Sequence, residues 1–142
     1  MIRKAHKKDY VNFIFYCQDY ADKIGNDKII QKIFRNAIKR DDWVYINEQN
    51  EVIRGAIISK KSNSRRFLQV LSVDYKIVVQ LFQVLCWSQD CDFWIQVNKT
   101  DALLKLFKKF KFFKQEENET DLILCRRLIR EDYKRDGRHN HR

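Results

Sequence analysis

Apolar residues recur at helical spacing in two segments of the first third of the chain. The spacing predicts a first helix over Tyr10–Ile24, with Asp9 as its N-cap and Gly25 as its C-terminal stop. A second helix is predicted over Lys28–Lys39, where Asp27 can act as the N-cap and isoleucines form one apolar face. With a short strand ahead of them, these segments predict the opening order strand, helix, helix.

Two further helical segments follow later in the chain. Tyr75–Ser88 is apolar nearly all round, so we expect it to be buried against a sheet, with Asp74 or Ser72 as its N-cap. The stretch KTDALLKLFKKF also has apolar residues at helical spacing, and Thr100 or Asp101 can cap it. Its lysines then face solvent while its aromatic residues face the core.

Between and after the helices, short runs rich in β-branched and aromatic residues predict strands. The connector NEQNE predicts an antiparallel hairpin, and Gly55 in its second strand predicts a bulge or a close backbone approach. KKSNSRR is predicted as a basic loop before a central strand. That strand and the next are expected to be parallel and to splay near Ser72, because one helix connects them. The predicted strands are Trp43–Asn47, Val52–Ser59, Phe67–Val73, Asp92–Asn98, one beginning at FFKQE, and Leu122–Leu128.

The chain has 142 residues, of which 44% are hydrophobic, so it can form one domain with its own core. We expect a single α/β domain with a mixed sheet over residues 1–129, followed by a basic tail over residues 130–142. The N-terminus lacks the apolar run of a signal peptide, and the longest apolar stretches are strand-sized. We therefore expect a cytoplasmic protein without membrane contact.

The positive charge lies mainly at the two ends of the chain, whose net charge is +10. Residues 1–40 hold ten basic and four acidic side chains, residues 41–125 hold twelve of each, and residues 126–142 hold seven and three. Basic ends suit nonspecific binding to nucleic acid, with a steep dependence on salt. They are also typical of a solvated surface that keeps a small protein in solution. The sequence leaves both interpretations open.

The four cysteines, Cys17, Cys86, Cys91 and Cys125, form no CxxC pair and sit mostly in apolar runs. We expect reduced thiols in the core, where free cysteine behaves as a small hydrophobic residue. Cys86 and Cys91 are five residues apart, which leaves a disulfide or half a metal site as alternatives. No cluster of histidine or cysteine completes such a site, so no metal is expected.

Three stretches, in this order, resemble the GNAT superfamily of acyl-CoA-dependent N-acyltransferases. IRKAHKKDY matches the family's opening strand and first helix, WVYINEQNEVIRGAII is similar to its second and third strands, and WIQVNKTDALLKLFKKFKFF is similar to the region where an asparagine ends the fifth strand. The resemblance covers nearly all of the chain and implies a GNAT-like fold, acetyl-CoA as the cofactor and N-acetyl transfer as the activity. The compact, proline-free, Lys/Asn/Ile-rich sequence is also similar to small GNAT-like proteins of phages.

The chain departs from the family at the loop that holds the CoA pyrophosphate. Family members use glycines there, which let backbone N–H groups approach the phosphates at a helix N-terminus. Aligned through the helix, the two glycine positions are Lys76 and Val78; aligned through the strand, the loop is instead shortened, and the motif is missing in both alignments. We therefore expect acetyl-CoA to bind weakly or not at all, with Lys76 and the cations of KKSNSRR as substitute contacts. The cofactor site that the resemblance implies consists of Leu71, Ser72, Val73, Lys76 and Asn98.

A second departure concerns proton transfer. Many relatives carry a tyrosine that protonates the departing CoA thiolate, and the matching position is Phe107, while the glycine before the sixth strand is Lys111. The central strand has Gln69 but no carboxylate to deprotonate an amine. Tyr75 and Asp74 are the remaining catalytic candidates, although Tyr75 can instead pack on apolar neighbours and Asp74 can cap the helix.

Three hypotheses for function remain open. The chain is a divergent N-acetyltransferase with weak or lost activity, or a non-catalytic GNAT-like protein that binds a protein partner or belongs to a phage virion. In the second case it acts in the host cytoplasm or in the virion. The third hypothesis is a nonspecific nucleic-acid-binding protein that uses its basic ends.

Overall fold

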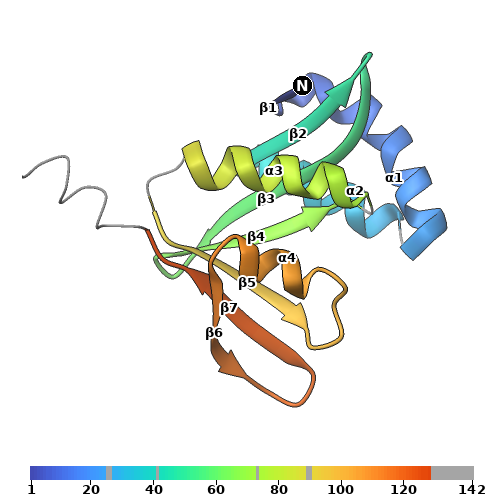
Figure 1. The fold of residues 1–142 in the computed structure, drawn as a ribbon. Coiled ribbons are helices and arrows are strands. Elements are labelled where there is room, and N and C mark those ends of the chain that lie inside the picture. Colours follow the sequence, from blue (N-terminus) through green and yellow to red (C-terminus); the bar gives the residue numbers. More distant parts are fainter. Residues whose placement is uncertain (25–26, 41, 73, 89–90, 129–142) are drawn as a thin grey trace, which may run out of the picture.

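The structure is a computed structural model that describes residues 1–24, 27–40, 42–72, 74–88 and 91–128. Its centre is a mixed seven-stranded sheet in the order β1-β2-β3-β4-β5-β7-β6 (Figure 1). The order of elements along the chain confirms the predicted α/β fold with a mixed sheet. The strands are β1 (Ile2–Lys4), β2 (Trp43–Gln49), β3 (Val52–Ser62), β4 (Arg65–Leu71), β5 (Phe93–Asn98), β6 (Phe112–Glu117) and β7 (Asp121–Arg126).

Helices cover the sheet on both faces and create two hydrophobic cores (Figure 1). α1 (Tyr10–Ile24) and α2 (Asp27–Lys39) pack on β2 and β3, where Phe13 and Phe34 stack with their ring centroids 3.8 Å apart. α3 (Tyr75–Ser88) and α4 (Leu104–Lys109) lie on the other core, in which Phe82 contacts the rings of α4 and β6. Both predicted pairs of helices are therefore present.

The strands β4 and β5 are parallel but pair at only one position, Phe67 with Trp94. All other neighbouring strands that the structure describes are antiparallel. Because the single pair lies near the start of both strands, they separate towards Ser72 and Asn98. This confirms the predicted parallel pair and its splay.

Gly55 lies both at a β-bulge and at a close approach of the backbone, the two alternatives predicted from its position in a strand. The register of β2 and β3 shifts beside it, from Asn47 opposite Gly55 to Glu48 opposite Ile53, which is a bulge. A Cβ atom at Gly55 would also lie 2.7 Å from the Ser72 Cβ and 2.9 Å from the Ile77 Cγ2. The start of α3 therefore packs so closely on β3 that only glycine fits there.

The prediction of a seven-residue basic loop at KKSNSRR is wrong. β3 continues to Ser62 and β4 begins at Arg65, so only Asn63 and Ser64 form the turn. Their φ values are 50° and 66°, and two-residue hairpin turns of type I′ require positive φ at both positions. The charged residues of this stretch therefore belong to paired strands, which holds them in fixed places.

Several predicted helix ends differ from the structure. Asp9 is not an N-cap of α1, because its carboxylate accepts bonds from the His6 backbone N–H, 2.7 Å away, and from Arg3. These bonds outweigh burial, which alone raises the pKa of Asp9, and lower it below its ordinary value. α4 begins only at Leu104, so neither Thr100 nor Asp101 caps it. Gly25 lies outside the described residues.

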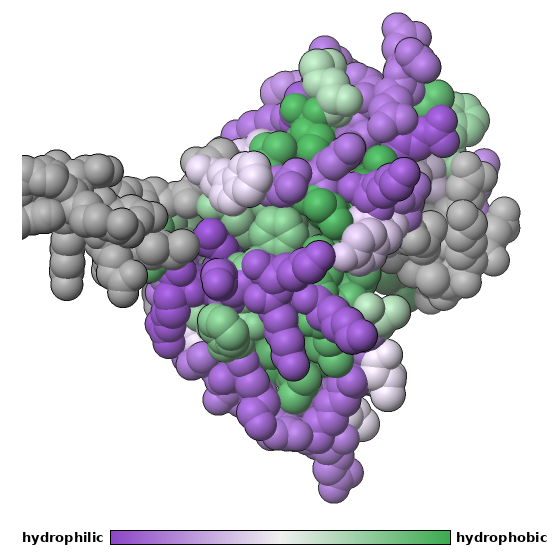
Figure 2. Space-filling view, in the orientation of Figure 1, coloured by the Kyte–Doolittle hydropathy of each residue, from purple (hydrophilic) through white to green (hydrophobic). Residues whose placement is uncertain are grey.

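α3 is not buried all round, because Trp87 is 73% exposed. Hydrophilic residues cover much of the side of the molecule that α3 and α4 form, with hydrophobic side chains visible between them (Figure 2). None of the helices that the structure describes is long and apolar enough to cross a membrane. The predicted tail, residues 130–142, lies outside the described residues.

None of the four cysteines forms a disulfide within the described residues. Cys17, Cys86 and Cys125 are buried in the core, as predicted, whereas Cys91 is only half-buried. Burial raises the pKa of the Cys86 thiol to about 11. It also raises the pKa of Cys125. No group of three or more metal-ligating side chains occurs within the part of the chain that the structure describes.

Candidate functional site

A cleft opens where β4 and β5 separate. Its volume of about 920 Å³ lies within the usual range of small-molecule sites. Consecutive residues of β4 (67–70) and of β5 (95–98) line it. Since alternate residues of a strand point to opposite faces, the cleft passes between the strands from one face of the sheet to the other. Ile33 and Asn36 of α2, with Arg40 directly after this helix, border it on one face, and Phe107 of α4 borders it on the other.

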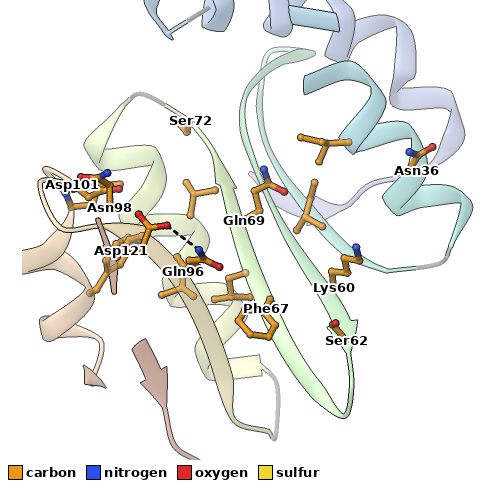
Figure 3. Close-up of a pocket in the computed structure, with 18 of the residues that line it drawn as sticks. Asn36, Lys60, Ser62, Phe67, Gln69, Ser72, Gln96, Asn98, Asp101 and Asp121 are labelled. Atoms are coloured by element: carbon orange, nitrogen blue, oxygen red, sulfur yellow. Dashed lines mark hydrogen bonds between the residues drawn. The ribbon is translucent and has the colours of Figure 1, made fainter. Parts of the chain in front are cut away.

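Side chains of opposite charge lie on the two sides of this cleft (Figure 3). Asp101 and Asp121 gather near the end of β5, whereas Lys60 lies across the cleft on β3. Gln96 reaches over from β5, and its Nε2 donates to Asp121 Oδ2 at 2.9 Å. The cleft therefore offers carboxylates to a cationic group and, on the opposite side, an ammonium group to an anionic one.

Short hydrogen bonds fix the rim of the cleft after β5. Asn98 Oδ1 accepts bonds from the Thr100 backbone N–H at 2.9 Å and from Thr100 Oγ1 at 2.6 Å. Asp101 Oδ1 accepts a bond from the Leu103 backbone N–H at 2.7 Å. Side chains that bind their own turn in this way are held in place, so Asn98 and Asp101 keep a constant position at the rim.

The end of β4 and the start of α3 form the second part of the site. Several of its backbone groups form hydrogen bonds with side chains of the chain itself. Asp74 Oδ1 accepts the Lys76 backbone N–H at 2.9 Å, which makes Asp74 the N-cap of α3. Ser72 Oγ accepts the Asp74 backbone N–H at 3.3 Å. The Leu71 carbonyl accepts the Tyr16 hydroxyl at 2.9 Å. Two of the amides that an incoming phosphate would use, those of Asp74 and Lys76, are therefore already bonded to internal acceptors.

The residues singled out from the sequence divide between these two parts. Ser72 and Asn98 line the cleft. Leu71, Asp74 and Lys76 belong to the second part, as described above. Tyr75 is 51% exposed on the first turn of α3 and does not line the cleft. Val73 lies outside the described residues.

Phe107 and Lys111 stand at the positions where the family resemblance implies a proton-donating tyrosine and a glycine. Phe107 is buried and borders the cleft, so the ring at this position has no hydroxyl that could donate a proton. Lys111 has φ 67°, which is the left-handed conformation that glycine favours. The backbone between α4 and β6 thus keeps the shape that a glycine would take, even though a lysine is present.

Sequence reasoning missed much of the polar lining, notably Asn36, Arg40, Gln96 and Asp121, although it had named Lys60 as a possible phosphate contact. Gln96 and Asp121 are 25 residues apart and meet because β5 pairs with β7, where Asn98 is opposite Asp121. One signal was available: Gln96 is the polar residue within the apolar run FWIQV, and a polar side chain there predicts a wet cavity. The contribution of α2 left no comparable signal.

Comparison with known proteins gives a clear result for structure. No protein-family model matches the chain, and no curated protein sequence matches it significantly. A GNAT-family acetyltransferase from Bacillus cereus superposes with a TM-score of 0.71 at 18% identity, over 92% of this chain and 98% of the other. An N-acetyltransferase from Staphylococcus aureus gives 0.66 at 16%, over 91% and 98%. The PaiA N-acetyltransferase from Thermoplasma acidophilum, solved in complex with coenzyme A, gives 0.64 at 14%, over 90% and 98%.

These similarities extend along nearly the whole chain in both directions, and they agree with the observed order of strands and helices. The identities are low, so they bear on the fold and not on the activity. The protein has the fold of the GNAT N-acetyltransferases.

Proposed function

We propose that this chain is a divergent N-acetyltransferase in which acetyl transfer from CoA is weak or lost. The observation that carries the proposal is the carboxylate of Asp74, which caps α3 at the point where a helix N-terminus would otherwise attract a phosphate. A pyrophosphate bound there would meet a negative charge and would have to displace an existing hydrogen bond. Both effects oppose the binding of acetyl-CoA.

The packing around Ser72 supports the same conclusion. A backbone that binds pyrophosphate must leave room for it, yet Ser72 and Ile77 lie within 3 Å of the position of a Gly55 Cβ. The turn is thus held against β3. Lys76 is exposed beside it and remains the residue best placed to supply a compensating positive charge.

The β4–β5 cleft could still hold an acceptor substrate, so weak acetyl transfer remains compatible with the structure. Asp101 and Asp121 can bind the amino group of an acceptor, and either can accept its proton. Phe107 provides no proton for a departing thiolate, and the absence of an acid or base usually costs about 10²- to 10⁴-fold in rate. Transfer would then depend mainly on positioning.

The test is the thermal shift caused by acetyl-CoA. A ligand at a hundredfold excess over its Kd stabilises the folded state by about 2.7 kcal/mol. For a domain of this size, that raises Tm by about 8 °C or more. Acetyl-CoA at about 1 mM should shift the wild-type protein by less than about 2 °C. A shift above about 5 °C that Lys76→Glu abolishes would contradict the proposal.

Asp74→Asn separates charge from capping, because asparagine also caps helices well. It should at least double the shift that acetyl-CoA causes, relative to its own ligand-free Tm. Glu119→Gln, which makes the same change of charge on the exposed turn between β6 and β7, is the matched control and should leave the shift unchanged. Equal effects of both variants would show that Asp74 has no local role in excluding the cofactor.

A further inference from the structure

Positive charge gathers at the tip of the β3–β4 hairpin, at the opposite end of β4 from the start of α3. Lys60, Lys61, Arg65 and Arg66 lie within seven residues on its two strands, and Arg127 joins them from the end of β7. Four of these cations, Lys61, Arg65, Arg66 and Arg127, line a hollow of about 600 Å³ together with Ser64, Cys91, Asp92 and Trp94, whereas Lys60 lines the β4–β5 cleft. This hollow is separate from the β4–β5 cleft.

Two tryptophans hold the arginines of the hairpin in place. The guanidinium carbon of Arg66 lies 3.5 Å from the ring centroid of Trp43, and that of Arg65 lies 4.0 Å from Trp94. Stacking fixes the plane of a guanidinium group and leaves its N–H edges directed outwards, so less entropy is lost when they bind an anion. The arginines are therefore preorganised donors.

Nearby carboxylates neutralise only part of this charge. Glu116 lies 3.5 Å from Arg65, and Asp92 lies 3.3 Å from Arg127. Among the described residues, no carboxylate forms an ion pair with Lys60, Lys61 or Arg66. The five cations and two anions leave a local net charge of +3.

We propose that the hairpin tip, defined as Lys60, Lys61, Arg65, Arg66 and Arg127, binds the phosphate backbone of nucleic acid. Guanidinium and ammonium groups are the side chains that bind phosphate oxygens, and several of them gathered at one hairpin tip can contact neighbouring phosphates. The binding does not read sequence, because these cations approach phosphates and no base-reading amide lies among them.

The tryptophans do not serve as stacking platforms for bases. Trp94 is only 7% exposed, and Arg65 covers its ring. Affinity therefore follows phosphate density, which favours duplex over single strand. In the sequence, residues 129–142 follow directly on Leu128 and hold five further basic side chains against three acidic ones. The Leu128 backbone N–H donates to Asp92 Oδ1 at 2.6 Å, which holds the last described residue beside the hollow.

Fluorescence anisotropy with a labelled duplex of about 20 base pairs tests the proposal on the full chain. Affinity should fall about tenfold or more between roughly 50 and 200 mM salt, and a single strand of equal length should show a smaller salt slope. The double variant Lys60→Glu, Lys61→Glu should bind at least about tenfold more weakly at 50 mM salt. It should also reduce the logarithmic salt slope by about 2.

Lys108→Glu with Lys109→Glu is the matched control, because these are also adjacent exposed lysines but lie on α4, outside the hollow. It should weaken binding less than about threefold, and both double variants should keep the wild-type circular dichroism spectrum. Equal losses in the two variants would mean that only net charge matters and would overturn the proposal. So would a wild-type protein that does not bind duplex at 50 mM salt. Polyglutamate that competes as well as unlabelled duplex would instead assign the hairpin tip to an acidic protein.

Discussion

The two ends of β4 both carry groups that can bind phosphate, but these groups differ in how many internal partners they already have. At the C-terminal end, the backbone amides of Asp74 and Lys76 donate to the side chains of Ser72 and Asp74, respectively. At the N-terminal end, the hairpin tip presents lysines and arginines with few carboxylate partners. The first end resembles the position where GNAT proteins hold CoA.

This contrast shows that phosphate-binding groups matter only when they are available. A helix N-terminus has the same partial charge in every protein, but a capping carboxylate neutralises it locally. Stacking on tryptophan does not neutralise the charge of Arg66. It fixes the guanidinium group, whose Nη1 also donates to the Ser59 carbonyl oxygen at 3.2 Å. The strand that connects both ends is the same, so the difference comes from a few neighbouring side chains.

Gly55→Ala tests the crowding at the C-terminal end and should have the largest effect. Alanine normally stabilises a strand relative to glycine by about 0.5–1 kcal/mol. Here its Cβ would lie 2.7 Å from the Ser72 Cβ, so we expect a loss of about 2 kcal/mol in the free energy of unfolding. Urea denaturation measures it.

Ser72→Gly removes the nearer of the two contacts, so in the Gly55→Ala background it should restore part of the lost stability. Gln69→Val, an exposed change on the neighbouring strand, is the control and should stay within about 0.5 kcal/mol. A stabilising Gly55→Ala would show that the turn has room to move and would weaken the case against phosphate binding there.

Asp74→Ala should cost about 1 kcal/mol, or roughly 3–5 °C in Tm, because the Lys76 N–H loses its acceptor. Asp74→Asn keeps an acceptor and should remain within about 0.5 kcal/mol of the wild type. Thermal unfolding of both variants distinguishes the two contributions. Equal losses would mean that the charge, and not the hydrogen bond, stabilises this end of β4.

The periodic spacing of apolar residues predicted the fold well, because a helix or strand that packs on a core needs apolar residues at regular intervals on its buried face. The helices at 10–24, 28–39 and 75–88 were found within one residue at each end, since their apolar faces meet the two cores. The splay of β4 and β5 followed from a single helical connection between parallel strands. The exposure of Trp87 at the end of α3 was not predicted, because an apolar residue in a sequence is normally expected to be buried.

The site was less predictable, because its residues meet through strand pairing. Resemblance placed the site near Ser72 and Asn98, and both do line the cleft. Gln96 and Asp121 meet only through the register of β5 with β7, which no local pattern specifies. The stretch KKSNSRR was predicted as a loop. Its two turn residues, Asn63 and Ser64, both adopt positive φ, but neither is the glycine that usually signals such a turn.

Ser64→Gly tests that turn at the N-terminal end and should have the smallest effect. Ser64 has φ 66° at the second central position of the hairpin, where glycine pays no steric cost. Relief of this strain, less the greater entropy of glycine in the unfolded chain, should stabilise the protein by about 0.5 kcal/mol. Ser62→Gly, two residues earlier in β3, is the matched control and should destabilise it by a similar amount. If Ser64→Gly were also destabilising, the hairpin would not contain this tight turn, and the cations of its tip would not be held by paired strands. An unchanged affinity of Ser64→Gly for duplex DNA would further show that the turn supports the hairpin tip without itself contacting the phosphates.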